Sequence, residues 1–145
     1  MAPVPVRLKS RRRAVAHLLE ELTEWARADP AVGAAVLVGS YARGAERMSS
    51  DVDVVVLGDT PDALEDAAWF TRLRPGSRLI RSATWGPVRE RRFRLRSGLI
   101  VELGIAPSSW AEVPLDAGTE RVLRDGHRIL YDTGVMAHAS AAVAQ

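Results

Sequence analysis

The sequence has no cysteine, and only one of its 20 basic residues, Lys9, is a lysine. Without cysteine the fold cannot depend on disulfides or thiolate metal sites, which suits a reducing compartment. Long apolar runs are also missing. The N-terminal segment is basic but lacks the apolar stretch of a signal peptide, and no later segment approaches the roughly 20 apolar residues of a membrane span. These absences predict a soluble, cytoplasmic protein that does not bind membranes.

Arginine is what the sequence has instead, with a formal net charge of only +2. The planar arginine fork binds phosphate through two hydrogen bonds, whereas lysine acts as a point charge. Abundant arginine and alanine are also typical of a GC-rich genome, so composition alone does not identify a phosphate ligand. The length of 145 residues and hydrophobic content of 47% predict a single domain over residues 1–145, with a core at about 12–132 and a frayed C-terminal tail.

Hydrophobic periodicity predicts both helices and short strands. Ser10 is expected to cap the first helix, and Thr60 and Pro61 to begin the second. Glycine at 86 and 98 favours hairpin turns between the later strands. Helices are expected at residues 12–28, 61–72 and 119–124, and strands at 34–38, 52–57, 79–85, 88–95, 99–105 and 128–131.

Two aspartates stand where the second predicted strand begins. Side chains alternate along a strand, so Asp51 and Asp53 share one face, while Val52, Val54 and Val56 face the core. The two Cα atoms would be roughly 6.5 to 7 Å apart, close enough for both carboxylates to bind one or two hard cations. Alternatively, the pair solubilises or caps the strand end. A calcium loop is not favoured, because the valines supply no further oxygen ligands.

A third carboxylate stands on a later predicted strand. Leu99, Val101, Leu103 and Ile105 form an apolar face, and Glu102 interrupts the opposite one. If the sheet places this strand beside the aspartate strand, three carboxylates meet. The alternative is an edge-strand charge that discourages aggregation.

The first strand runs directly into Gly39 and Ser40, which open a turn or short helix up to about residue 46. Such a turn exposes backbone N–H groups to an anion, and phosphate is the natural ligand. Ser40 can add a hydroxyl donor, and Gly44 lets the backbone come close. Arg43 either reaches a phosphate oxygen or points into solvent.

Gly39-Ser40, ten intervening residues and then Asp51-Val52-Asp53 resemble the GS…DxD signature of the DNA polymerase β-like nucleotidyltransferase superfamily, particularly its minimal nucleotidyltransferases. The resemblance is strongest over residues 34–57 and extends to about residue 105. It implies an α+β fold in which helices flank a mixed central sheet.

The resemblance also implies roles for the singled-out residues. Asp51 and Asp53 would bind two Mg²⁺ ions, and Glu102 would complete the metal site, where relatives more often have aspartate. Gly39 and Ser40 would hold the β- and γ-phosphates of a nucleoside triphosphate, with ATP expected. Two other acidic residues, Asp59 in a turn and Asp62 in the first turn of a helix, are poorer candidates for the third metal ligand.

The reaction implied by the resemblance is in-line transfer of a nucleoside monophosphate to a hydroxyl, with release of pyrophosphate. Glu102 could also accept the hydroxyl proton. The acceptor would be a protein, such as a HEPN-type toxin partner, or a small molecule, as in drug-modifying members. The short segment after residue 105 leaves little room for an acceptor domain, so a partner chain or a homodimer would form the other wall. The alternative is a non-catalytic nucleotide-binding or antitoxin module.

The arginine-rich run at residues 88–96 forms a cationic ribbon on a predicted strand. Arg92, Arg94 and Arg96 share one face of that strand with Glu90. The ribbon could bind RNA, an acidic protein or the nucleotide's phosphates, but a solvated face is the more usual meaning of such a run. Nucleic acid is not favoured, because no RNP-like aromatic motif is present.

Two tryptophans near these strands are expected to fill the core rather than line a pocket. Trp85 and Trp110 each stand alone in the sequence, and isolated tryptophans usually pack in the interior.

Overall fold

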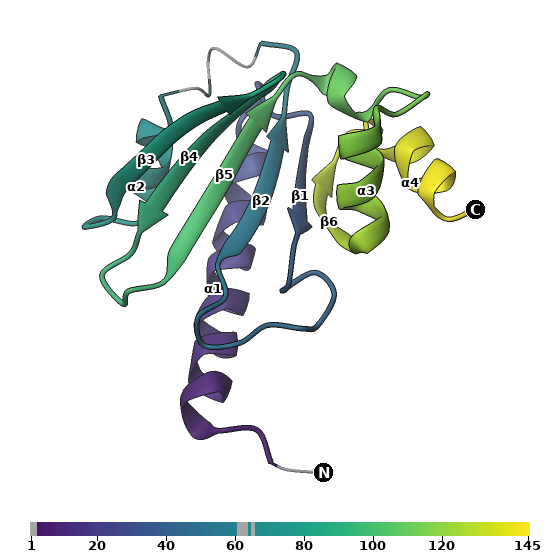
Figure 1. Ribbon diagram of the computed structural model, residues 1–145. Coiled ribbons are helices and arrows are strands. Elements are labelled where there is room, and N and C mark those ends of the chain that lie inside the picture. The colour runs from purple at the N-terminus through teal and green to yellow at the C-terminus, as the bar shows by residue number, and fades with distance from the viewer. Residues whose placement is uncertain (1–2, 61–63, 65) are drawn as a thin grey trace.

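The computed structural model describes residues 3–60, 64 and 66–145. They form a six-stranded mixed sheet with helices on both faces (Figure 1). The helices are α1 (Val6–Ala28), α2 (Ala68–Leu73), η2 (Ser108–Ala111, a 3₁₀ helix), α3 (Ala117–Asp125) and α4 (Ala137–Val143). The strands are β1 (Ala34–Val38), β2 (Val52–Leu57), β3 (Arg78–Trp85), β4 (Val88–Arg94), β5 (Ile100–Ala106) and β6 (His127–Asp132). Each predicted strand is confirmed to within one residue at either end.

The strand order across the sheet is β3-β4-β5-β2-β1-β6. β2 and β5 run parallel, and all other neighbours in this sheet are antiparallel. A parallel pair needs a long crossover. Here α2 and the β3–β4 hairpin supply it, and they return the chain to β2 in the same direction. The predicted α+β fold with a mixed sheet and flanking helices is confirmed.

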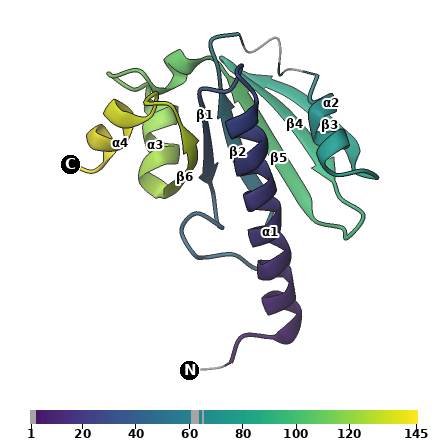
Figure 2. The same cartoon turned by 180° about the vertical axis from the view of Figure 1, so that it is seen from behind.

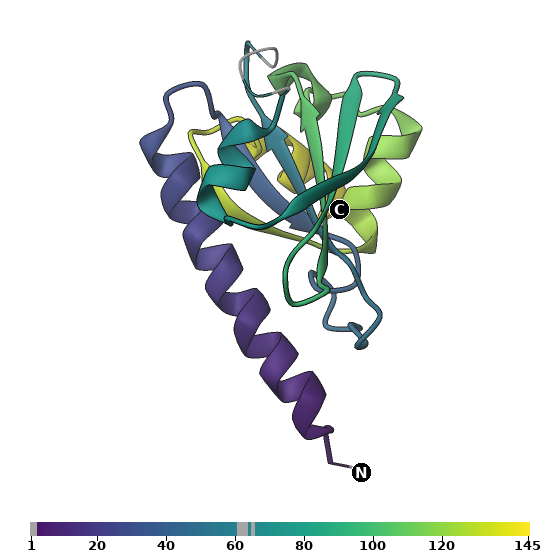
Figure 3. The ribbon, with the colours of Figure 1, turned by 90° about the vertical axis from the view of Figure 1, so that its left-hand side faces the viewer.

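We call the sheet face that α1 and α2 pack against the covered face (Figures 2 and 3). Leu18 of α1 and Phe70 of α2 are fully buried there, against residues such as Val54 and Leu103. The two helices are also joined by stacked indole rings of Trp25 and Trp69, whose centroids are 3.6 Å apart. This face holds the main hydrophobic core. The N-terminal turns of α1 project beyond the sheet (Figure 3).

We call the opposite side of the sheet the open face, because helices cover only part of it. η2, α3 and α4 lie there near β1 and β6 (Figure 1) and enclose a second core that includes Val36, Leu57, Leu123 and Met136. Trp110 of η2 belongs to this core and is only 8% exposed, which confirms its predicted burial, although it also lines the cleft described below. The rest of the open face, over β2, β5 and β4, carries the acidic residues of the candidate site.

The helix boundaries correct several predictions. α1 begins at Val6, so Ser10 lies inside the helix and does not cap it; the carbonyl of Pro5 already accepts the Lys9 N–H at 3.0 Å. α2 begins only at Ala68, because Ala67 before it has a left-handed backbone (φ 53°) that a helix cannot continue through. The predicted start at Pro61 lies outside the described residues.

The C-terminal region is more helical than predicted. α3 starts after Asp116, whose Oδ1 accepts the Thr119 N–H at 2.8 Å as an N-cap. The tail forms α4 rather than fraying, because Met136 and Ala139 are buried against the open face. No helix in the described part of the chain has the length and apolar character needed to cross a lipid bilayer.

Candidate active site

The parallel pairing of β2 and β5 gathers acidic residues on the open face. Asp53 of β2 lies opposite Glu102 of β5 in the register. Neighbouring strands are about 4.8 Å apart, so these two carboxylates start from adjacent backbone positions. Asp51 directly precedes β2, and by alternation its side chain lies on the same face. The structure therefore brings together the carboxylates of Asp51, Asp53 and Glu102, as the sequence predicted.

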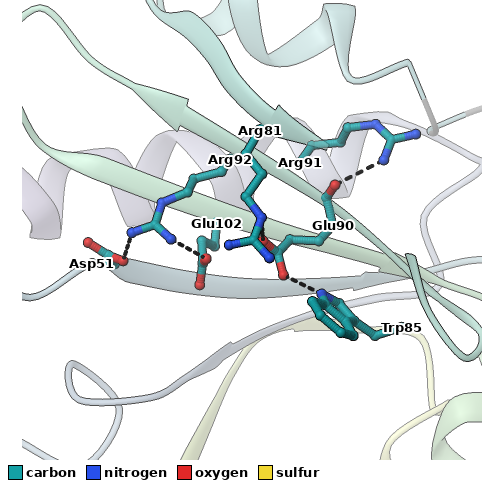
Figure 4. A network of polar contacts seen from close by, with 7 residues as sticks. All are labelled: Asp51, Arg81, Trp85, Glu90, Arg91, Arg92 and Glu102. Atoms are coloured by element: carbon teal, nitrogen blue, oxygen red, sulfur yellow. Dashed lines mark hydrogen bonds and ion pairs between the residues drawn. The ribbon is translucent and has the colours of Figure 1, made fainter. Parts of the chain in front are cut away.

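Arg92 lies between two of these carboxylates (Figure 4). Its Nη2 donates to Asp51 Oδ2 at 2.6 Å, and its Nη1 donates to Glu102 Oε1 at 3.1 Å. For Arg92 the prediction of a solvated face is wrong, because β4 pairs with β5 in a register that sets this residue opposite Glu102. The sequence showed the alternation of the arginines along the strand but contained no signal for that register.

Burial and crowding raise the pKa of both aspartates. Burial is the main cause that raises the pKa of Asp53 to about 8; a hydrogen bond to Glu102 and the negative charges of Glu102 and Asp51 add to the shift, and Arg92 opposes it. Burial also raises the pKa of Asp51, an effect that Arg92 opposes and Glu102 reinforces. Three carboxylates thus lie beside one guanidinium, and a cation that binds Asp53 would displace the proton that its raised pKa favours.

The turn after β1 lies directly against this cluster. Val38, the last residue of β1, pairs with Asp53, and Gly39 follows with a positive φ of 74°. A Cβ on Gly39 would collide with Asp53 Oδ2, so only glycine lets the backbone lie this close to the carboxylate. The predicted amide-lined turn and the predicted acidic site are therefore neighbours in space.

The same turn keeps backbone N–H groups available. The N–H groups of Ala42 and Arg43 donate to Gly39 O, at 3.1 and 3.4 Å. Within the described residues, no hydrogen bond is formed by the N–H of Ser40 or Tyr41. Adjacent unpaired amides next to a cation site are suited to an anion such as phosphate.

A contact with α1 holds the loop that links this turn to β2. Arg12 Nε donates to Glu46 Oε1 at 2.9 Å, and the Glu46 side chain is only 11% exposed. The Tyr41 ring packs against the main core, and burial raises the pKa of its hydroxyl. These contacts attach the turn and the start of the loop to the folded body.

The acidic cluster opens into a cleft of about 690 Å³. Its floor is the open face of the sheet, with Asp53, Glu102 and Gly104 among the lining residues. One wall is the tip of the β3–β4 hairpin and the other is α3. This volume lies within the usual range of about 300–1,000 Å³ for small-molecule sites. A small-molecule substrate therefore has room beside the carboxylates.

Trp85 stands on the hairpin wall of this cleft and is 59% exposed, so its predicted place in the core is wrong. Its Nε1 donates to Glu90 Oε2 at 2.8 Å, and the Arg81 guanidinium lies 5.9 Å from the ring centroid (Figure 4). β3 is an edge strand of the sheet. A side chain on it packs only if another element covers it, which the sequence pattern does not reveal.

A family model described as "Nucleotidyltransferase domain" matches residues 18–100. The chain belongs to this family. The matched segment includes the Gly39 turn and both aspartates and stops just before Glu102. Among solved structures, that of Cid1 poly(U) polymerase is similar with a TM-score of 0.49 and 12% sequence identity, over 85% of this chain. This chain spans 34% of the Cid1 chain. No curated protein matches.

The donor chemistry of this nucleotidyltransferase domain suits a divalent metal ion. Carboxylate oxygens from Asp51, Asp53 and Glu102 are the ligands that Mg²⁺ prefers, and these three side chains lie beside a single guanidinium, that of Arg92. As the side chains lie, no three metal-ligating groups among the described residues surround one point closely enough to hold an ion. Arg92 takes one oxygen each of Asp51 and Glu102, so a metal ion held by the same carboxylates would lie next to the guanidinium.

The remaining predicted site residues of the nucleotidyltransferase domain differ in whether they line the cleft. Arg43 lines the cleft, and its backbone lies against Gly126, where a Cβ would be only 3.0 Å from Arg43 Cβ. Ser40 and Gly44 are not among the cleft-lining residues. Gly44 has a positive φ of 69° with no atom near its missing Cβ, so its glycine serves the turn itself. Asp59 is exposed and follows the far end of β2.

Proposed function

We propose that this chain is a metal-dependent nucleotidyltransferase that moves a nucleoside monophosphate from a nucleoside triphosphate, ATP being the first candidate, to a hydroxyl group. The acceptor oxygen would form a bond to the α-phosphorus while the bond to the bridging oxygen of the β-phosphate breaks, so that pyrophosphate leaves. The observation that carries the proposal is the convergence of Asp51, Asp53 and Glu102 beside the Gly39 turn, with Asp53 and Glu102 at the floor of a cleft.

Each part of the site has a defined task in this reaction. Asp51, Asp53 and Glu102 would hold Mg²⁺ ions. When bound, such ions neutralise phosphate charge and acidify the attacking hydroxyl. The free N–H groups at the start of the turn and the Arg43 guanidinium would bind phosphate oxygens. Glu102 could receive the proton that the acceptor hydroxyl loses.

The cleft walls suggest where the acceptor enters. The floor between the β3–β4 hairpin and α3 lies beside the carboxylates and has no helix over it (Figure 1). An acceptor could be a small molecule that fills this cleft, or a hydroxyl on a partner protein, such as a HEPN-type toxin or a second copy of this chain, that closes it.

A second candidate is a non-catalytic nucleotide-binding or antitoxin module of the same fold. One observation favours it: Arg92 bridges Asp51 and Glu102, and no three-ligand group stands ready among the described residues. Such a module would bind a triphosphate and act through a partner without turnover.

The test is incubation with Mg²⁺ and ATP labelled on the α-phosphate, alone and with candidate acceptors. Label transfer that needs Mg²⁺ and is lost in Asp53→Asn supports the enzyme. Asp59→Asn is the matched control, since it removes an exposed carboxylate at the other end of the same strand and should leave transfer unchanged. Triphosphate binding without transfer supports the module, and absence of Mg²⁺-dependent binding contradicts both.

A further inference from the structure

Arg92 is the one cation that touches two of the predicted metal ligands in the described part of the chain. We propose that Arg92 is a positioning residue that holds the place of a metal ion: it keeps Asp51 and Glu102 together in the metal-free protein and competes with a divalent cation for them. This inference rests on the proposed function, because it concerns the same carboxylates.

The fold fixes Arg92 in this place. The next residue, Phe93, is 2% exposed and packs into the covered-face core, with its ring 4.8 Å from that of Phe70. Because successive side chains on a strand point to opposite faces, Arg92 must then point to the open face. Pairing with β5 sets it beside Glu102. The backbone of Arg92 is therefore fixed beside the carboxylates, although its long side chain can turn.

The contacts explain why the competition is direct. The guanidinium uses two nitrogens, one for Asp51 Oδ2 and one for Glu102 Oε1, in the fork geometry that arginine offers and lysine does not. A Mg²⁺ ion would take oxygens of the same two side chains. Each carboxylate keeps a second oxygen, but a Mg²⁺ ion bound there would lie close to the guanidinium, and the two cations would repel each other. Metal binding should therefore weaken or open at least one of the two contacts.

The surroundings explain why a substitute cation is useful. The side chains of Asp51 and Glu102 are only 25% and 27% exposed, and Asp53 stands opposite Glu102 in the neighbouring strand. Partly buried carboxylates repel one another when no cation lies between them. Arg92 keeps them in place before the metal arrives, at the cost of weaker metal binding.

The first measurement is calorimetric titration of Mn²⁺ into the full chain without nucleotide. Arg92→Gln should bind Mn²⁺ at least about tenfold more tightly than the wild type, a change of about 1.4 kcal/mol. Arg94→Gln is the matched control: it removes the same charge from the same face of the same strand, but Arg94 is exposed and distant by two positions. It should change affinity by less than about twofold, because exposed charges are screened.

The second measurement is the melting temperature with and without Mn²⁺. Metal-free Arg92→Gln should melt below the wild type, and Mn²⁺ should raise its melting temperature by more. If Arg92→Gln does not fold without metal, Arg92→Lys replaces it in the titration. Lysine keeps the charge but cannot hold both carboxylates as a fork, so its affinity for Mn²⁺ should exceed that of the wild type by about two- to tenfold.

Equal or weaker Mn²⁺ binding by these Arg92 variants would overturn the competition. That result alongside intact Mg²⁺-dependent label transfer in the wild type would reject only this inference. Absence of Mn²⁺ binding by both the wild type and the Arg92 variants would also overturn this inference, whereas absence of both Mg²⁺-dependent label transfer and triphosphate binding would reject the proposed function.

Discussion

The two faces of the sheet use neighbouring residues of the same strands in opposite ways. Val54 and Leu103 point to the covered face and are 1% and 0% exposed, whereas Asp53 and Glu102, one position earlier on each strand, meet on the open face. The first pair stabilises the fold by excluding water. The second pair gathers like charges that cost folding free energy. Adjacent residues on each strand therefore belong to the core on one face and to the candidate site on the other.

The largest expected loss of stability comes from shortening a buried side chain on the covered face. Leu18→Ala should lower the free energy of unfolding by about 2–5 kcal/mol, because it leaves a cavity where a fully buried side chain was. Urea unfolding measures it. Leu79→Ala on the exposed edge strand β3, 50% exposed, is the control and should change stability by less than about 0.5 kcal/mol. Similar losses in both variants would contradict the assignment of the core to the covered face.

A methyl group between the Gly39 turn and Asp53 should have the next largest effect. Gly39→Ala must strain a left-handed backbone and push against the Asp53 carboxylate, so we expect a loss of about 1–3 kcal/mol in unfolding free energy and weaker Mn²⁺ binding. Gly98→Ala, in the β4–β5 turn, also has a positive φ but nothing near its missing Cβ. Gly98→Ala should therefore lose stability but bind Mn²⁺ as the wild type does.

The destabilising effect of the carboxylates on the open face should appear as a pH dependence of the unfolding free energy. The pKa of Asp53 is about 8 in the folded protein and about 4 in an unfolded chain, so between these pH values the folded state holds the extra proton. Stability should then fall as pH rises from about 4 to about 8. Asp53→Asn removes this titration. In metal-free urea unfolding, its free energy of unfolding relative to that of the wild type should therefore increase as pH rises from about 4 to about 8. If the difference in unfolding free energy between the two proteins stays constant across these pH values, the titration of Asp53 is not the cause of the pH dependence.

The smallest expected effect concerns the α3 wall of the cleft. Asp116→Ala removes the N-cap of α3 and should cost about 1 kcal/mol, because the Thr119 N–H loses its acceptor. Asp116→Asn keeps a capping oxygen and should be close to the wild type. Thermal unfolding of both variants tests this. Equal stability of the alanine and asparagine variants would mean that the cap does not stabilise the wall.

The strands and the acidic cluster could be predicted from sequence because both follow from local sequence patterns. Apolar alternation located β2 and β5, and the same alternation put Asp53 and Glu102 on the face away from the core. Their meeting required only that the two strands be neighbours, as the family resemblance implied, and the structure confirms it. The roles of these residues as metal ligands stay predictions.

Other features depend on contacts between distant segments and were beyond sequence reasoning. Arg92 looked like its neighbouring arginines, and only the pairing of β4 with β5 distinguishes it. Trp85 was expected in the core, but nothing in the described part of the chain covers it at the sheet edge. The alanine-rich tail has little pattern of its own, and it is helical because Ala139 packs against the open face.

The parallel pair at the centre of the sheet also bears on the order of folding. β2 and β5 are separated in the chain by α2, β3 and β4, so their pairing must close a long loop. Hairpins close faster than such long-range pairs. We therefore expect the β3–β4–β5 meander to form first and to dock afterwards on β2. Asp53 and Glu102 would then come together only at that late step, after the apolar sides of the same strands have already begun to collapse.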